Sequence, residues 1–149
     1  MEKSTQRNNL LIYGNATRPD GPAMTWAMHA IAQLDIDDVV SDRVFRDTYE
    51  RYMRQPFYTW TEAATGYQGT NSFITGAGGF LQLILNGYAG IRLHDEYLEI
   101  RNSQLPPYTG WITINGMFKI HNNYTKLLIY EVLPSAIVFV LIIINYNFG

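Results

Sequence analysis

A single carboxylate among aromatic residues is the group in this sequence best suited to acid–base chemistry. It is Glu62, in the run Trp60-Thr61-Glu62, and it precedes a glycine- and threonine-rich connection that leads into an expected helix. A carboxylate held near a reacting bond can give or take a proton as a general acid or base. Most acidic residues on loops do no chemistry, so the residue pattern by itself also allows an ordinary loop carboxylate here.

The helix expected after this connection is rich in glycine at its start. Thr75 is predicted to cap it, and Gly87 or Gly90 to end it. The glycines of its first turn are Gly76, Gly78 and Gly79. Each glycine weakens a helix by up to ~1 kcal/mol, so such a cluster indicates a close approach of the backbone to another part of the protein.

Two earlier helices are expected to position these elements. The first starts at Asp20-Gly21-Pro22 and runs from Ala23 to about Leu34, with apolar residues around much of its circumference, which predicts burial on more than one side. His29 lies within it, and a core or surface histidine is favoured over a substrate contact. The second, Asp37 to Arg54, is amphipathic and carries a Glu50–Arg54 pair at i,i+4 spacing.

After residue 90 the pattern changes from helical to strand-like. Strands are predicted at 91–93, 97–100, 110–120 and 126–132, with a turn at Asn115-Gly116 and another near Asn122-Asn123. The fold class is therefore mainly α followed by β, preceded by a polar segment over residues 1–20. Residues 132–149 form an apolar tail that reads as a buried strand or an altered chain end. A membrane span is disfavoured, because the run is short and lies next to Glu131.

Composition limits the partners. The formal net charge is −2, which gives no basic field for nucleic acid. There is no cysteine, so neither disulfides nor cysteine metal sites are expected, and we expect no cofactor. The apolar run near the N-terminus is too short for a secretory signal, which favours a cytoplasmic location.

Several ordered motifs resemble the end of the catalytic domain of glycoside hydrolase family 65, the family of acid trehalases and of kojibiose and maltose phosphorylases. The likeness covers roughly Gly21 to Arg92 and thins toward Glu131. The matching pieces are Gly21-Pro22-Ala23-Met24-Thr25-Trp26, Pro56-Phe57, Trp60-Thr61-Glu62, Asn71-Ser72-Phe73-Ile74-Thr75-Gly76, Gly78-Gly79-Phe80-Leu81-Gln82, Gly87-Tyr88 and Gly90-Ile91-Arg92.

The resemblance implies a fold and a role for several residues. Residues 21–90 would be the last helices of an (α/α)6 barrel, and residues 91–131 the first strands of a C-terminal β-sandwich. Enzymes of this family invert the sugar's configuration, which needs one carboxylic acid and one carboxylate. Glu62 is the implied general base, and the acid is expected on an earlier barrel helix to which no residue of this chain corresponds. Trp60, Thr61 and Gln82 are secondary candidates for substrate contact.

The resemblance also implies a carbohydrate substrate and an incomplete enzyme. Within the family the motifs are most similar to the branch that releases glucose from the glucosylgalactosyl-hydroxylysine of collagen. A barrel of about a dozen helices needs more than 149 residues at ~11–12 residues per helix, so we expect a fragment that is inactive alone. A disaccharide phosphorylase, a trehalase and a non-catalytic truncated product remain alternatives.

Overall fold

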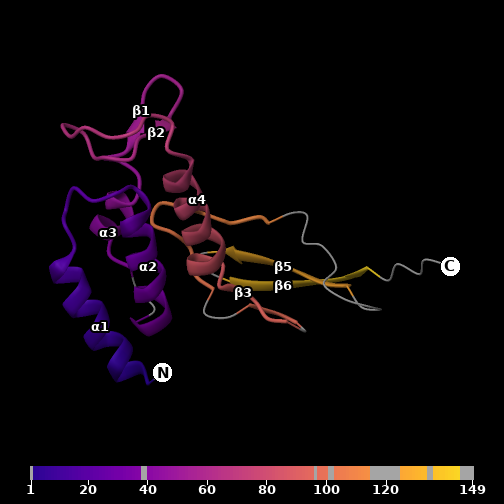
Figure 1. The fold of residues 1–149 in the computed structure, drawn as a ribbon. Coiled ribbons are helices and arrows are strands. Elements are labelled where there is room, and N and C mark those ends of the chain that lie inside the picture. Colours follow the sequence, from indigo (N-terminus) through magenta and orange to yellow (C-terminus); the bar gives the residue numbers. More distant parts are fainter. Residues whose placement is uncertain are drawn as a thin grey trace. The chain divides into compact units, whose positions relative to one another are not determined.

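The computed structural model describes residues 2–37, 40–95, 97–100, 103–114, 125–133 and 136–144 of the 149-residue chain. The chain divides into two compact units, Met1–Tyr88 and Ala89–Gly149, and each is described by itself. In these residues the first unit is mostly helical and the second contains short antiparallel strand pairs (Figure 1). The expected order of helices followed by strands is thus confirmed.

Helix α2 (Met24–Asp37) is the centre of the first unit. It contacts α1 (Lys3–Ala16), α3 (Asp42–Asp47), α4 (Ile74–Gln82) and the π-helix η1 (Leu83–Tyr88), so the predicted burial on more than one side is confirmed (Figure 1). Its buried stripe begins one residue before the helix and consists of Ala23, Ala27, Ala30 and Leu34. Three alanines in this stripe let neighbouring backbones come close, because they carry no side chain beyond Cβ.

Helix α1 (Lys3–Ala16) occupies the segment for which the sequence predicts only a polar stretch. None of its residues is buried, so its sequence lacks the apolar spacing that would reveal a helix. It contacts α2, and the hydroxyl of Thr17, just beyond its end, donates a hydrogen bond to the carbonyl of Tyr13 at 2.6 Å.

Helix α3 (Asp42–Asp47) is much shorter than the predicted helix of residues 37–54, which is wrong in length. Ser41 caps it, accepting a hydrogen bond from the N–H of Val44 at 3.3 Å. The hydroxyl of Thr48 bonds to the Phe45 carbonyl, which competes with the helical pattern. Turns then lead into strand β1 (Met53–Arg54), which pairs antiparallel with β2 (Thr59–Trp60).

The charged face of α3 also differs from the prediction. Glu50 pairs with Arg46 at 3.5 Å instead of with Arg54. Arg54 instead donates hydrogen bonds to backbone carbonyls, among them that of Ala63 at 3.2 Å. The short helix explains the change, since residues 50 and 54 no longer share one helical face.

Helix α4 (Ile74–Gln82) continues into η1 (Leu83–Tyr88). Thr75 is not its cap, because the helix begins at Ile74 and Phe73 precedes it without a side-chain hydrogen bond. Gly76 and Gly79 are buried where α4 crosses the start of α2, which confirms that this part of the glycine cluster marks a close backbone approach. Gly90, with φ of +70°, follows the end of η1.

The core of the first unit consists of aromatic residues and small residues such as alanine. Phe45 contacts Tyr88 edge to face at 5.6 Å between ring centroids, and Phe80 lies between Phe45, Tyr49 and Trp60. A second cluster of buried residues joins Ala23, Tyr52 and Ala64, with Trp26, Trp60 and Phe73 packed against it. These clusters pack Trp60 of strand β2 against Phe80 of α4 and beside Ala23 and Trp26 at the start of α2.

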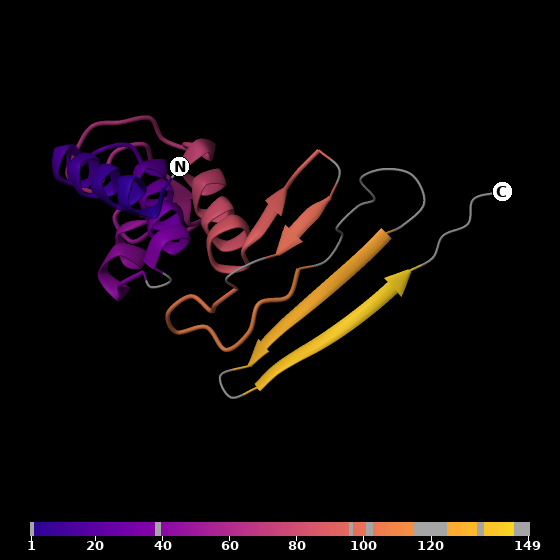
Figure 2. The same ribbon diagram turned by 90° about the horizontal axis from the view of Figure 1, so that it is seen from below.

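The described residues of the second unit form two antiparallel strand pairs. Strand β3 (Ile91–Leu93) pairs with β4 (Leu98–Ile100), and β5 (Thr125–Leu133) pairs with β6 (Ala136–Ile144), as Figure 2 shows. The strands predicted at 91–93, 97–100 and 126–132 are confirmed to within two residues. The strand predicted at 110–120 is wrong over 110–114, and its remainder lies outside the described residues.

The predicted apolar tail, residues 132–149, includes the end of β5 and all of β6. Residues 134–135 and 145–149 lie outside the described part, as do both turns predicted near residues 115 and 122. Among the described residues, no helix has the length and apolar character that crossing a bilayer requires.

The contact between α2 and α4 gives a matched pair of substitutions. A methyl group at Gly76 would lie 2.6 Å from the Cβ of Ala23, so Gly76→Ala should lower the free energy of unfolding by about 1–3 kcal/mol. At Gly78 a methyl group would meet no atom within 4 Å, so Gly78→Ala should raise it by up to about 1 kcal/mol. Urea denaturation followed by tryptophan fluorescence measures both. Equal changes in the free energy of unfolding for the two variants would contradict the close contact between α2 and α4 at Gly76.

Candidate functional site

The backbone of Glu62 is fixed from two directions. The N–H of Ala23, at the start of α2, donates to the Glu62 carbonyl at 2.9 Å. The N–H of Glu62 donates to the carbonyl of Thr70, also at 2.9 Å. A loop residue is thereby tied both to a buried helix and across its own loop, which restricts where its side chain can point.

The carboxylate of Glu62 is half-buried and points back to the same loop. Its Oε2 accepts a hydrogen bond from the N–H of Thr70 at 3.1 Å. Within the described ranges, no arginine or lysine forms an ion pair with it, and Oε1 has no hydrogen-bond partner. One oxygen is therefore oriented by the backbone while the other is available to a water molecule or a ligand.

Trp60 and Thr61 are the immediate neighbours of this carboxylate in strand β2 and the loop. The ring of Trp60 packs on Phe80 at 5.7 Å between centroids, and its carbonyl accepts the N–H of Phe73 at 2.6 Å. Thr61 is 8% exposed, and its hydroxyl lies 2.9 Å from the Ala63 carbonyl and 3.1 Å from the Tyr52 carbonyl. These contacts give Thr61 a role in holding the backbone beside Glu62.

Gln82 lies apart from this run. It is the last residue of α4 and is exposed, whereas Trp60, Thr61 and Glu62 are consecutive in β2 and its following loop. Since α4 contacts β2, the structure places Gln82 on the helix that supports the segment of residues 60–62. Three of the four candidate residues are thus brought together by the chain itself.

Three supporting residues were missed because all three fall within the helix expected over residues 37–54. Arg51 donates to the carbonyl of Pro19 at 2.8 Å, Tyr52 donates to that of Gly21 at 2.8 Å, and Arg54 reaches Ala63. These three side chains thus bond to the backbone just before α2 and just after Glu62. The sequence signal available was the break of helical spacing at Gln55-Pro56.

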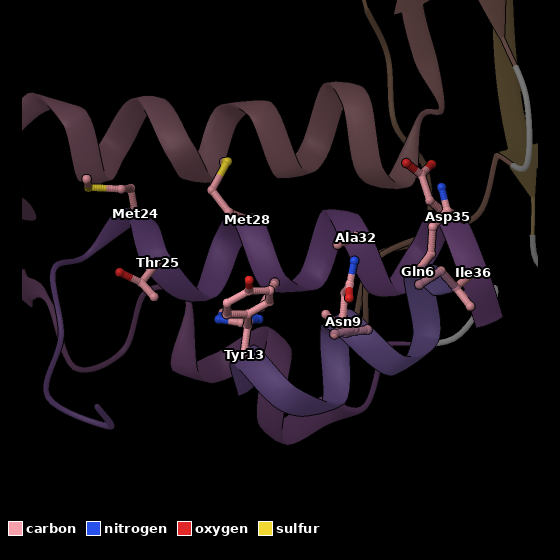
Figure 3. A pocket seen from close by; sticks show the side chains of 11 residues that line it. Gln6, Asn9, Tyr13, Met24, Thr25, Met28, Ala32, Asp35 and Ile36 are labelled. Carbon is pink, nitrogen blue, oxygen red and sulfur yellow. The ribbon is translucent and has the colours of Figure 1, made fainter. Parts of the chain in front are cut away.

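A cavity of about 530 Å³ lies between α1 and α2 in the same unit (Figure 3). Its lining is mostly apolar, with Met24, Met28 and Ile36 from α2, and Asp35 at one end. Of the described residues, neither Glu62 nor any of the other three candidates contributes to this lining. The cavity is therefore separate from the carboxylate site.

His29 also lines this cavity, and its ring is held on one side. Its Nε2 lies 3.0 Å from the hydroxyl oxygen of Thr17, whose proton goes to the Tyr13 carbonyl, so the His29 Nε2–H is the donor to Thr17. Burial lowers the pKa of His29 from its ordinary value of 6.5. Among the described residues, no group of three or more histidine, aspartate or glutamate side chains is arranged to hold a metal ion.

Comparison with known proteins identifies relatives over most of this chain. The protein-glucosylgalactosylhydroxylysine glucosidase of Dictyostelium discoideum is 37% identical over 126 residues, covering 83% of this chain and 17% of the relative. The enzyme of that name from Mus musculus is 41% identical over 117 residues, covering 78% of this chain and 17% of the relative. An acid trehalase of Emericella nidulans is 30% identical over 137 residues, covering 81% of this chain and 13% of the relative.

The chain therefore spans about a sixth of the length of the glucosidases it matches. No profile of a known protein family matches the sequence, and no solved structure matches it.

The buried hydroxyl of Thr61 should be measurable as stability. In Thr61→Val the carbonyls of Tyr52 and Ala63 lose a shared donor but keep the bonds from the Thr61 N–H and from Arg54, so the free energy of unfolding should fall by about 0.5–1.5 kcal/mol. Thr61→Ser keeps the hydroxyl and should lose less. Thermal and urea unfolding of the three proteins test this, and a serine variant as unstable as the valine variant would contradict it.

His29 should make the first unit less stable in acid. Because burial lowers its pKa in the folded state, the unfolded chain binds the proton more tightly. The free energy of unfolding should be highest above pH 6.5 and should fall as the pH drops through 6.5 toward the folded pKa. His29→Gln should flatten this decline in urea titrations at pH 7.5, 6.5 and 5.5. An unchanged slope would show that other groups cause it.

Proposed function

Because the chain is homologous to enzymes of glycoside hydrolase family 65, we propose that it forms part of the catalytic domain of an inverting α-glucosidase-type hydrolase. In this proposal residues 21–90 are the last helices of an (α/α)6 barrel, residues 91–131 belong to a following β-sandwich, and the preceding polar segment and apolar tail lie outside both. The substrate class is a glucosylated hydroxylysine, taken from the names of the glucosidases that match.

Glu62 is the general base in this proposal. Inverting hydrolysis places a carboxylate on one side of the glycosidic carbon and a carboxylic acid on the other, typically ~6.5–9.5 Å apart, with water between the carboxylate and the sugar. The observation that carries the assignment is the anchoring of Glu62 by Ala23 and Thr70, with Oε1 facing no partner among the described residues. Oε1 would take the proton of the water that attacks the sugar.

The general acid is assigned to no residue of this chain. It would protonate the leaving oxygen, so catalysis by Glu62 depends on a second carboxyl group placed opposite. Trp60 is proposed to stack on a sugar ring, since its half-buried indole is already fixed by Phe80. Thr61 and Gln82 are secondary contacts, Thr61 acting mainly through the backbone that it supports.

A phosphorylase would need phosphate in place of water, and the start of α4 is the natural place for it. The packing does not favour this use. The N–H of Gly76 already donates to the Phe73 carbonyl at 3.1 Å, and Gly76 and Gly79 face α2. Hydrolysis is therefore the better supported reaction.

The test replaces the matching segment of the mouse glucosidase with this chain and measures release of glucose from glucosylgalactosyl-hydroxylysine. Glu62→Gln should lower kcat by about 10²–10⁴-fold with little change in KM, because the base acts in the transition state. Glu50→Gln is the matched control: Glu50 pairs with Arg46 at the surface and should leave kcat unchanged.

Near-normal kcat in the Glu62→Gln enzyme would refute the role of Glu62. If the mouse glucosidase that carries this chain without substitutions turns over only when inorganic phosphate is added, the phosphorylase would instead be favoured.

A further inference from the structure

Tyr52 bonds to two backbone positions close to Glu62 and its anchor: Gly21, two residues before Ala23, and Thr61, directly before Glu62. It lies in the turn between α3 and β1, with none of its surface exposed. Its hydroxyl donates to the carbonyl of Gly21 at 2.8 Å. Its own carbonyl accepts the N–H of Thr61 at 2.9 Å and lies 3.1 Å from the Thr61 hydroxyl.

The side-chain bond fixes the segment before α2. Gly21 is separated by Pro22 from Ala23, whose N–H donates to the Glu62 carbonyl. The ring of Pro22 fixes its φ, which leaves the ψ of Pro22 as the one soft torsion between the Gly21 carbonyl and the Ala23 N–H. Holding the Gly21 carbonyl therefore restricts where the Ala23 N–H can point.

The backbone carbonyl of Tyr52 fixes the segment directly before Glu62. Thr61 immediately precedes Glu62, so the two bonds from Thr61 to Tyr52 determine where the Glu62 peptide begins. The side chain and the backbone carbonyl of Tyr52 therefore both help to position Glu62.

The Tyr52 hydroxyl is well suited to a permanent bond. Burial raises the pKa of Tyr52 above its ordinary value of 10.0, so the phenol keeps its proton and remains a donor throughout the neutral range. Its ring packs with Ala23 and Ala64, which holds the hydroxyl in place.

We propose that Tyr52 is a positioning residue for Glu62, acting through the bond from its hydroxyl to Gly21. Its effect on catalysis rests on the proposed role of Glu62, whereas its effect on the Glu62 backbone does not. Removing the hydroxyl leaves the ring in the core but releases the Gly21–Ala23 segment, so the Glu62 carbonyl loses a fixed donor.

Amide hydrogen exchange in the 149-residue chain tests the anchoring. Tyr52→Phe should raise the exchange rates at Ala23 and Thr70 about tenfold and leave that at Leu34, far along α2, unchanged. Tyr88→Phe is the matched control: Tyr88 is 1% exposed, and its hydroxyl has no hydrogen-bond partner among the described residues. It removes the same group and should leave all three rates unchanged.

Unchanged rates at Ala23 and Thr70, or a uniform rise at all three amides, would overturn the proposal. If Tyr52→Phe does not fold, Thr61→Val removes the side-chain bond of the second link, leaves the bond from the Thr61 N–H to Tyr52, and should still speed exchange at Glu62 and Thr70. Unchanged rates in that variant would also overturn it.

A double-mutant cycle tests the link to catalysis. It uses the mouse glucosidase in which this chain replaces the matching segment. Tyr52→Phe alone should lower kcat about tenfold with KM unchanged, and should have no further effect when Glu62→Gln is present. Equal effects of Tyr52→Phe in both backgrounds would show a general structural role and overturn the proposal. Full activity of Glu62→Gln would refute the proposed base, while the exchange rates would still decide whether Tyr52 anchors the segment.

Discussion

The hydrogen bond from the N–H of Ala23 to the carbonyl of Glu62 is the constraint on which the carboxylate site depends. It joins the start of a buried helix to a loop that has no regular structure of its own. Loops without a ladder of hydrogen bonds are held by whatever partners their peptide groups find. Here the partners are other backbone groups: Thr61 bonds to Tyr52, Thr65 to Arg51 and Phe73 to Trp60.

The residue that makes this bond also lies where α2 and α4 come very close together. Ala23 can face Glu62 and Gly76 at once only because neither Ala23 nor Gly76 carries a large side chain. The buried alanines of α2 and the glycines of α4 are two halves of one contact, and the helical cost of each glycine is offset by the packing that it permits. Gly78, which faces open space, takes no part in this contact.

The sequence predicted the elements that local sequence rules determine and missed those that tertiary contacts determine. The Gly21-Pro22 start and apolar circumference of α2 follow from local rules, as does the glycine-marked contact of α4. Residues 48–54 have helical spacing but leave the helix, because the Thr48 hydroxyl bonds to Phe45 and the Tyr52 side chain is drawn to Gly21. Helix α1 has no buried residue, so its sequence has no helical spacing of apolar residues from which it could be predicted. Glu62 was singled out through its neighbours and through motif resemblance, whereas the residue pattern alone also allowed an ordinary loop carboxylate.

The way in which Glu62 is held bears on what it can do. An arginine placed against a carboxylate forms two parallel charge-assisted hydrogen bonds and occupies both oxygens. In the part of the chain that the structure describes, Glu62 receives a single bond from a neutral backbone donor, on Oε2 alone. The group is oriented without being neutralised by a cation, and one oxygen faces no competing donor. A carboxylate that must receive a proton from water needs these two properties together, since orientation without access and access without orientation would each slow the transfer.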